Sequence, residues 1–310
     1  MIALAEDALA NCRPARIAPT LVGRLTAVRG QFFTASGFRC AIGTGAEIDR
    51  RILAEVVGFE SGETILMALQ QDASPQPGAR VVIRPSSMMA HVGDALLGRV
   101  IDAAGHPIDA QGPIFVESVR DVRGTVGNPL DGGSVRKPFQ TGVRVIDALM
   151  TLGRGQRMML AAGSGVGKST LIRQMIDGAE ADVVVVALVG ERNREIVDFV
   201  EATRASDACR NTVTVAVPGD RSPLLRIRAA QRATTIAEHF RDAGKNVLLI
   251  VDSLTRVAHA QRELGLGTGE TPTMKGYPPS ALAMIPALVV TYAVRNPVRH
   301  WNREFAIRHS

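Results

Sequence analysis

Short apolar alternations broken by glycine fill the region from Leu21 to about Ser87. Apolar and polar residues alternate over 22–28 and 63–69, and a turn rich in proline at 74–78 precedes another apolar stretch at 80–84. An alternation of period two, interrupted by turn residues at short intervals, is typical of antiparallel strands. The pattern therefore predicts a small antiparallel barrel or sandwich at this end of the chain.

Beyond Thr141 the pattern changes to short, nearly continuous apolar runs that alternate with helical stretches. Ser222 is placed to cap a helix that has Pro223 at its first position, runs toward Arg241 and ends at Gly244. Apolar runs separated by helices indicate a parallel sheet covered on both faces, which is the α/β class. The predicted strands are 157–162, 183–189, 212–217 and 247–251, and the predicted helices are 168–176 and 223–241.

These patterns divide the 310 residues into about two domains, as the chain length also suggests. Glycine and proline gather between residues 105 and 142, which indicates a long connector. The predicted organisation is an extension at 1–20, a β-barrel domain at 21–90, a connector at 91–140, an α/β domain at 141–288 and an atypical tail at 289–310.

Composition excludes several classes of protein. No apolar run approaches the ~18 residues that a membrane-spanning helix needs, so we expect a soluble, intracellular protein. Three cysteines without CxxC spacing fit reduced thiols better than disulfides or a zinc site. The net charge of +6 raises the possibility of a nucleic-acid partner, but half of it lies in the tail at 289–310 and aromatic residues make up only 4%. Scattered, solvated arginines are therefore the favoured interpretation.

The sharpest motif reads AGSGVGKS over residues 162–169, between a predicted strand and a predicted helix. It fits the phosphate-binding loop G-x-x-x-x-G-K-[ST] except that Ala162 replaces the first glycine. Glycines let backbone N–H groups converge on phosphate oxygens, lysine neutralises the β and γ phosphates, and the serine hydroxyl coordinates Mg²⁺. An ordinary glycine-rich turn has no need of that lysine and serine. The predicted nucleotide-binding residues are Gly163, Ser164, Gly165, Val166, Gly167, Lys168, Ser169 and Thr170.

Two carboxylates follow predicted strands of the same sheet. Asp252 ends the strand 247–251, where it can reach the magnesium shell, so we predict Ser169 and Asp252 as metal-binding residues. Glu191 follows the strand 183–189 and faces the same crevice, where it can polarise a water for attack on the terminal phosphate. The alternative for Glu191 is a salt bridge with Arg192 or Arg194, and an arginine there can also contact the γ-phosphate.

At these residues the sequence resembles the type III secretion ATPases of flagella and injectisomes, within the rotary ATPase α/β-subunit superfamily. The resemblance runs from about Leu21 to Leu288 and covers the phosphate-binding loop, where alanine is also that family's usual first residue. The other matching segments are GDALLGRVIDAAGHPID (93–109), TGVRVIDALMTLGRGQRM (141–158), VGERNREIVDF (189–199), PGDRSPLLR (218–226), VDSLTRVAHAQRE (251–263) and KGYPPSALAMIPAL (275–288).

The resemblance implies an N-terminal β-barrel and a P-loop (RecA-like) domain, ATP and Mg²⁺ as ligands, and ATP hydrolysis coupled to chaperone release and unfolding of exported proteins. Its implied catalytic residues are Glu191, Lys168 and Arg192. It also implies a homohexamer in the cytoplasm, peripheral at the inner membrane, with a central stalk, a stator, export chaperones and secreted substrates as partners and no nucleic acid. Tyr277, in the loop KGYPP, lies toward the ring's central surface in such ATPases, although a purely structural turn explains it equally well.

After Leu288 the resemblance ends, and residues 289–310 carry the only tryptophan and two of the six histidines. We therefore expect a chain truncated or frameshifted at that point, without the C-terminal helical domain and the arginine finger of the family. Losing an arginine finger slows P-loop NTPases by ~10³ to 10⁵. The alternatives to an export ATPase are a nucleotide-binding remnant without turnover and, less favoured, a hexameric nucleic-acid translocase.

Overall fold

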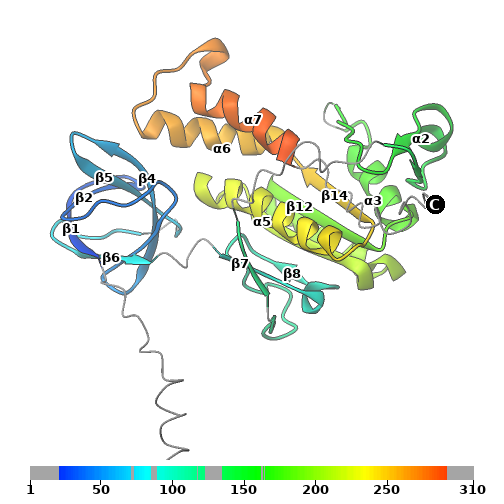
Figure 1. The fold of residues 1–310 in the computed structure, drawn as a ribbon, viewed down its shortest axis with the longest axis horizontal. Helices are drawn as coiled ribbons and strands as arrows, with labels where there is room; N and C mark the ends of the chain where they lie inside the picture. Colours follow the sequence, from blue (N-terminus) through cyan, green and yellow to red (C-terminus); the bar gives the residue numbers. More distant parts are fainter. Residues whose placement is uncertain are drawn as a thin grey trace, which may run out of the picture.

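The computed structural model describes residues 21–70, 73–84, 89–116, 118–122, 135–161, 163 and 165–291. Figure 1 shows a barrel on one side and a layered α/β body on the other. The predicted extension at 1–20 and residues 292–310 of the predicted tail lie outside the described residues. The helix that precedes this tail, α7, runs from Pro279 to Thr291.

The N-terminal region is a closed barrel of six antiparallel strands in the order β1-β2-β5-β4-β3-β6, which decides between the barrel and the sandwich. Inward-facing side chains such as Phe33, Leu66 and Val81 are fully buried. Register shifts in β1 and β4 mark bulges, which let strands bend around a closed surface. The strands are β1 (Val22–Arg29), β2 (Phe32–Ser36), β3 (Gly45–Ile48), β4 (Ile52–Glu60), β5 (Glu63–Ala68) and β6 (Arg80–Arg84).

The second region is built on a parallel four-stranded sheet in the order β14-β12-β13-β8. Its strands are β8 (Val100–Ile101), β12 (Val183–Glu191), β13 (Thr212–Pro218) and β14 (Val247–Asp252). The three long strands confirm the predicted apolar strands at 183–189, 212–217 and 247–251. Because the sheet is parallel, all of these strands place their carboxyl ends at one edge.

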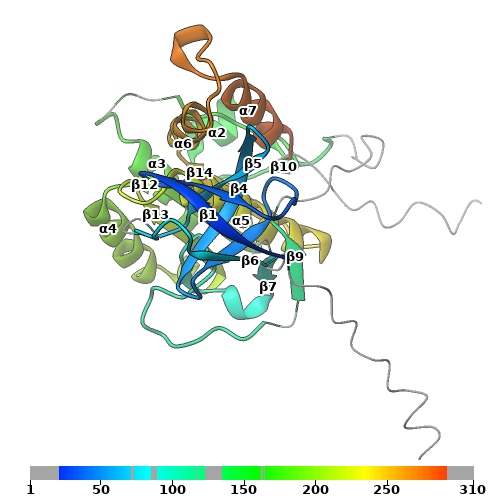
Figure 2. The same cartoon turned by 90° about the vertical axis from the view of Figure 1, so that its left-hand side faces the viewer.

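Helices cover both faces of this sheet (Figures 1 and 2). Odd-numbered residues of β12, such as Val185, pack into one core with α5 (Pro223–Asp242), whereas even-numbered residues, such as Val186, pack against α3 (Lys168–Gly178) and α4 (Asn193–Arg204). The period of two along a strand therefore explains why the apolar run is continuous. The predicted α/β class is confirmed.

Helix α5 begins as predicted. The Ser222 hydroxyl accepts a hydrogen bond from the N–H of Leu225 at 3.4 Å, and Pro223 occupies the first helical position. The helix ends at Asp242, and Gly244 adopts a left-handed conformation with φ of 84° that glycine adopts without strain.

The remaining elements are short or lie at the periphery of the sheet. The 91–140 segment, predicted as a connector, contributes β8 to the main sheet and pairs β9 with β7. The elements are β7 (Met89–Val92), η2 (Asp94–Leu96), β9 (Ser118–Asp121), β10 (Pro138–Phe139), α2 (Arg144–Leu149), β11 (Leu152–Gly153), η4 (Asp207–Asn211), α6 (Leu254–Gly267) and η5 (Met274–Gly276).

One predicted strand is wrong. Residues 157–161 have no regular secondary structure, although they are apolar and precede the glycine-rich loop as expected. A strand forms only when a neighbour accepts its hydrogen bonds, and among the described residues β14 pairs with β12 alone and offers no pairing to 157–161. Leu160 nevertheless packs against the cores beneath α3.

Among the described residues, a buried ion pair and a close ring contact help to fasten the barrel to the α/β body. Glu55 of β4 accepts hydrogen bonds from Nε of Arg228 on α5, at 3.0 Å, and from its Nη2, and both residues are more than nine-tenths buried. The ring of Phe32 lies on Gly267 at the end of α6, where an added Cβ would come within 2.1 Å of the ring. No helix among the described residues is long and apolar enough to span a bilayer.

Candidate nucleotide-binding and catalytic site

The glycine-rich loop adopts the backbone conformation that its glycines permit. Gly165 and Gly167 have φ angles of 79° and 96°, in the left-handed region, and Gly167 directly precedes the first residue of α3. An 11-residue helix therefore presents free N–H groups at this point, where an anion is stabilised. Gly163, Val166, Ser169 and Thr170 are also exposed, whereas Ala162 and Ser164 lie outside the described residues.

Lys168 and Asp252, which are 84 residues apart in sequence, form an ion pair. Lys168 is the first residue of α3, and Asp252 is the last residue of β14 with only 8% of its surface exposed. The structure thus brings the predicted phosphate-binding lysine and the predicted metal-binding carboxylate together. A lysine held by a carboxylate is oriented toward the loop before any ligand enters.

The donor set of this site fits a magnesium ion. The Asp252 carboxylate and the Ser169 hydroxyl supply oxygen donors, and the ion pair of Lys168 with Asp252 brings the segment that carries Ser169 to the end of β14. Magnesium is commonly held by one or two protein oxygens together with phosphates and waters. The described residues include no cluster of three or more histidine, cysteine, aspartate or glutamate side chains placed to hold a metal ion.

Glu191 ends β12, the strand beside β14. The register of β12 against β13 shifts between Val189 and Glu191, because Gly190 adopts a left-handed conformation with φ of 72°. An arginine from α6, Arg256, donates from Nη2 to Oε2 of Glu191 at 3.0 Å and from Nη1 to the carbonyl oxygen of Gly190. The bulge and the arginine together fix the direction of the carboxylate.

The surroundings of Glu191 raise its pKa to about 7. Burial is the main cause, followed by a hydrogen bond with Glu195 and by the negative charge of Asp252, while Arg256 opposes the shift. A carboxylate that titrates near neutral pH is suited to exchange a proton with a water at the pH of the cell. The salt-bridge alternative for Glu191 is also realised, but with Arg256 rather than with Arg192 or Arg194.

The Arg192 side chain is 84% exposed and pairs with Glu195 at 3.2 Å, in the first turn of α4. It lies at the wall of a cavity of about 340 Å³ that Glu191, Arg256 and Gly219 also line. Arg192 therefore borders the same cavity, and its predicted approach to the terminal phosphate remains a prediction.

Sequence reasoning did not single out Arg256. The signal is its spacing: it follows Asp252 by four residues, which places it about one helical turn into α6 at the same edge of the sheet. Tyr277, by contrast, lies beyond α6, where Arg262 sits 5.5 Å from its ring centre and His259 packs beside it.

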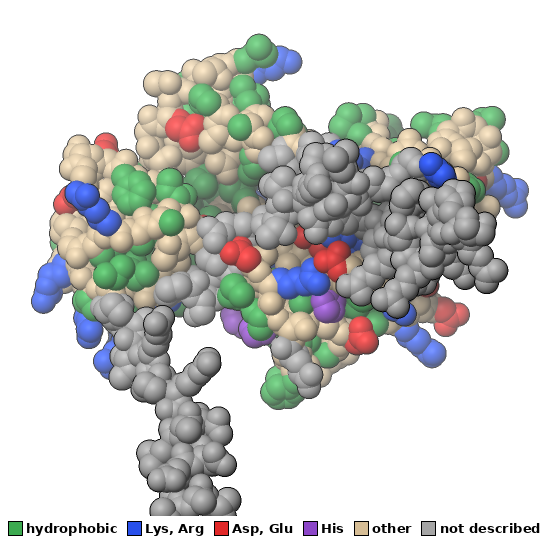
Figure 3. Space-filling model, viewed as in Figure 1, with side chains coloured by type: hydrophobic (Ala, Val, Ile, Leu, Met, Phe, Trp, Pro, Cys, Tyr) green, Lys and Arg blue, Asp and Glu red, His purple; other side chains and the backbone are tan. Residues whose placement is uncertain are grey.

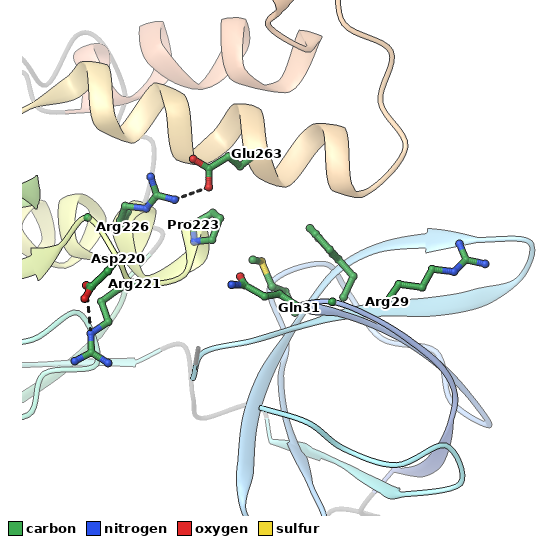
Figure 4. A pocket seen from close by; sticks show the side chains of 11 residues that line it. Arg29, Gln31, Asp220, Arg221, Pro223, Arg226 and Glu263 are labelled. Carbon is green, nitrogen blue, oxygen red and sulfur yellow. Dashed lines mark hydrogen bonds and ion pairs between the residues drawn. The ribbon is translucent and has the colours of Figure 1, made fainter. Parts of the chain in front are cut away.

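A second cavity, of about 600 Å³, lies between the barrel and the start of α5 (Figure 4). Gln31 and Met67 line it from the barrel, and Pro223 and Glu263 line it from the α/β body. The turn at Gly219 and Asp220 borders both cavities. This turn is therefore shared between the barrel interface and the Glu191 cavity.

Comparison with known proteins shows the family to which the chain is related. The nucleotide-binding domain of the ATP synthase alpha/beta family matches residues 142–293. The chain is 43% identical over 278 residues to the flagellum-specific ATP synthase of Pseudomonas aeruginosa and 46% identical over 282 residues to that of Salmonella typhimurium, covering 87% and 86% of this chain. It spans 62% of the length of each of these relatives.

The relatives include injectisome proteins as well. The type 3 secretion system ATPase of Xanthomonas euvesicatoria is 41% identical over 272 residues, with 86% of this chain and 62% of that protein covered. The assembled ATPase EscN of the enteropathogenic E. coli type III secretion system superposes with a TM-score of 0.83 at 37% identity, over 89% of this chain and 67% of EscN. The chain therefore belongs to the flagellum-specific and type III secretion ATPases.

Proposed function

We propose that this chain hydrolyses ATP to energise protein export through a flagellar or type III secretion apparatus. The observation that carries the proposal is the convergence of three predicted groups at one edge of the sheet. The glycine-rich loop, the pair Lys168–Asp252 and the carboxylate of Glu191 come from neighbouring elements, and the charge of Asp252 acts on Glu191. A P-loop ATPase requires these parts in this arrangement.

Each residue has a distinct part in the proposed reaction. Loop N–H groups and Lys168 bind the phosphates, and Ser169 and Asp252 hold the magnesium ion, which neutralises charge on the phosphate oxygens when bound. Glu191 orients a water and accepts its proton as the water's oxygen attacks the γ-phosphorus, and the bond to the ADP oxygen breaks. Arg192, exposed at the cavity wall, swings toward the terminal phosphate.

The proposed assembly follows the relatives. EscN has been described in assembled form and in complex with its central stalk EscO. For this chain we propose a homohexamer in the cytoplasm, peripheral at the inner membrane, that contacts a central stalk, a stator, export chaperones and secreted substrates. Coupling of hydrolysis to chaperone release and substrate unfolding belongs to the same proposal.

A nucleic-acid translocase is disfavoured by the distribution of charge. On the face shown in Figure 3, lysine and arginine side chains of the described residues lie scattered among acidic and apolar ones and form no continuous basic track. Binding to single-stranded nucleic acid draws on such a track together with stacked aromatic side chains. Strong, salt-dependent binding of single-stranded RNA would favour the translocase instead.

The test compares binding and turnover of Mg-ATP by the purified chain and three variants. We expect Lys168→Ala to lose both binding and turnover. Glu191→Gln should keep binding and lose turnover, because the amide that replaces the carboxylate accepts no proton. Lys245→Ala, which removes an exposed lysine far from the loop in sequence, is the matched control and keeps both. Calorimetry measures binding, and phosphate release measures turnover.

Each result distinguishes between the proposals. Binding without turnover in the unmodified chain would support a nucleotide-binding remnant, which is the alternative function. Turnover that persists in Lys168→Ala would contradict the assigned site, and no heat of Mg-ATP binding by the folded chain would contradict nucleotide binding itself.

A further inference from the structure

The backbone that carries Glu191 is enclosed by two arginine side chains. A Cβ added at Gly190 would lie 2.9 Å from Cδ of Arg256 and 3.6 Å from Cδ of Arg226, so both aliphatic stems pack against this glycine. Arg256 also donates a hydrogen bond to the carboxylate, as described above, whereas the guanidinium of Arg226 is directed to a different acid. Arg226 therefore packs against the backbone next to Glu191, while its guanidinium pairs with another acid.

Arg226 forms an ion pair with a residue of helix α6. Its Nη2 donates to Oε2 of Glu263 on α6 at 2.5 Å, and Figure 4 shows the two side chains directed toward each other. The Arg226 side chain is only 11% exposed, and its buried Nε has no hydrogen-bond partner among the described residues. Glu263 is thus the acidic partner that fixes the direction of this guanidinium.

The pair connects the two helices that carry the surroundings of Glu191. Arg226 lies in the first turn of α5, directly after the turn whose Gly219 N–H donates to the carbonyl oxygen of Glu191 at 3.1 Å. Glu263 lies seven residues after Arg256, which is about two helical turns along the same face of α6. α5 and α6 also share an apolar core, so losing the contact between Arg226 and Glu263 would remove a polar tie between them next to the bulge at Gly190 without separating the helices.

We infer that Arg226, held by Glu263, is a positioning residue that keeps the strand end at Gly190 in place and thereby aims Glu191. The inference rests on the proposed function, because it takes Glu191 as the catalytic carboxylate. It assigns no contact with nucleotide to Arg226. A displacement of about 1 Å at a reacting group is enough to slow a reaction by roughly 10²-fold.

The first measurement is steady-state ATP hydrolysis by variants of the full chain. Arg226→Met keeps much of the stem but removes the charge and the donor to Glu263, so we expect kcat to fall by roughly 10- to 100-fold while KM for ATP stays within about twofold. Arg226→Lys keeps the stem and a charged donor and should restore most of kcat. Arg221→Met is the matched control: this arginine lies just before α5, is exposed, and is paired only loosely with Asp220 at 3.9 Å.

The second measurement does not depend on turnover. The Glu191 carboxyl is followed by NMR titration of protein labelled with ¹³C at the glutamate carboxyls, and the signal is assigned with Glu191→Gln. The groups that face it are Arg256 from α6, Glu195 from α4 and Asp252 from β14. If Arg226 positions the strand end, its loss opens Glu191 to solvent, and the pKa of Glu191 falls from about 7 toward its ordinary 4.5.

The two measurements separate failure of the inference from failure of the proposed function. An unmodified chain without turnover contradicts hydrolysis, while the titration still decides the role of Arg226. If kcat and the pKa of Glu191 are both unchanged in Arg226→Met, the inference is overturned and hydrolysis stands. Should Arg226→Met fail to fold, Glu263→Gln replaces it, because the Glu263 side chain is half-exposed and its loss is tolerated more readily. The same fall in kcat and in pKa is then expected, and unchanged values would overturn the inference.

Discussion

Every strand of the barrel is hydrogen-bonded on both sides, whereas among the described residues β14 of the nucleotide-binding sheet has a neighbour on one side only. The contrast extends to burial. Residues of β5 are buried almost throughout, but those of β14 before Asp252 are partly exposed. A closed barrel has no edge strands to protect. The sheet edge where Asp252 and the glycine-rich loop meet therefore lies in the region whose strands are less completely hydrogen-bonded and less buried.

The difference separates the region with the more stable fold from the region that carries the candidate site. The barrel holds itself together and carries none of the groups that form the candidate site. The site residues lie at strand ends, at a helix start and in an exposed loop, which are the parts of a fold that open most easily. Substitutions chosen in pairs, one from each region, test this division.

The largest expected effect compares two leucines given the same substitution. Leu66 is fully buried in the barrel, and Leu248 is half-buried on β14. We expect Leu66→Ala to lower the free energy of unfolding by about 3–4 kcal/mol and Leu248→Ala by about 1–2 kcal/mol, because less apolar contact is lost at the open edge. Urea unfolding followed by circular dichroism measures both. Equal losses would show that β14 is as well secured as the barrel.

A smaller effect is expected at the joint between the two regions. Glu55→Gln leaves Arg228 buried without its acidic partner, so we expect a loss of about 2–3 kcal/mol and earlier separation of the barrel from α5. The control is Glu60→Gln. Glu60 pairs with Arg29 at 3.7 Å with both side chains more than half exposed, so its loss should stay below about 1 kcal/mol. Similar losses in both variants would show that burial of the Glu55 pair adds nothing.

The smallest effect is expected at Glu191 in the candidate site and concerns how stability depends on pH. Because the pKa of Glu191 is raised from 4.5 to about 7, the folded chain binds more protons than the unfolded chain between these values. The unmodified protein therefore loses stability as pH rises through this window, and Glu191→Gln escapes that loss. Because Glu191 borders an open cavity, water screens much of this effect, so we expect the variant to melt only roughly 2–4 °C higher at pH 8, with the difference gone below pH 4.5.

Thermal melts at the two pH values measure this effect, with Glu201→Gln on the exposed surface of α4 as the control. A variant that melts lower than the unmodified chain at pH 8 would mean that the Glu191 carboxylate stabilises the fold. That result would contradict burial as the main cause of its raised pKa.

Local signals in the sequence predict three barrel strands, the three long strands of the parallel sheet, and helices α3 and α5. The strand at 80–84 and the start of the helix at Pro223 are confirmed to the residue, because an alternation and a cap are properties of neighbouring residues. The strand at 157–162 fails because a strand also needs a partner, which lies elsewhere in the chain. Closure of the barrel is likewise decided by the pairing of β1 with β6, far apart in sequence.

The candidate site shows the same division. The sequence motif identifies Lys168, and the strand-then-acid pattern identifies Asp252, and the structure joins them. The contact of Arg256 with Glu191 was not predicted, because it depends on how α6 packs against β12. The sequence thus predicts candidate site residues where they belong to a local motif. It does not predict contacts between side chains that only the tertiary fold brings together.

The pairing of Lys168 with Asp252 has a consequence for which ligands the loop accepts. An anion without a metal ion would attract the ammonium group of Lys168 away from Asp252. The largely buried carboxylate would then have no counter-charge, which is energetically unfavourable. A ligand that arrives with its own divalent cation avoids this, since the cation compensates the acid while the anion compensates the amine. If the loop binds nucleotide as proposed, entry into the site would be an exchange of ionic partners, and anions without a metal ion would bind less well than their magnesium complexes.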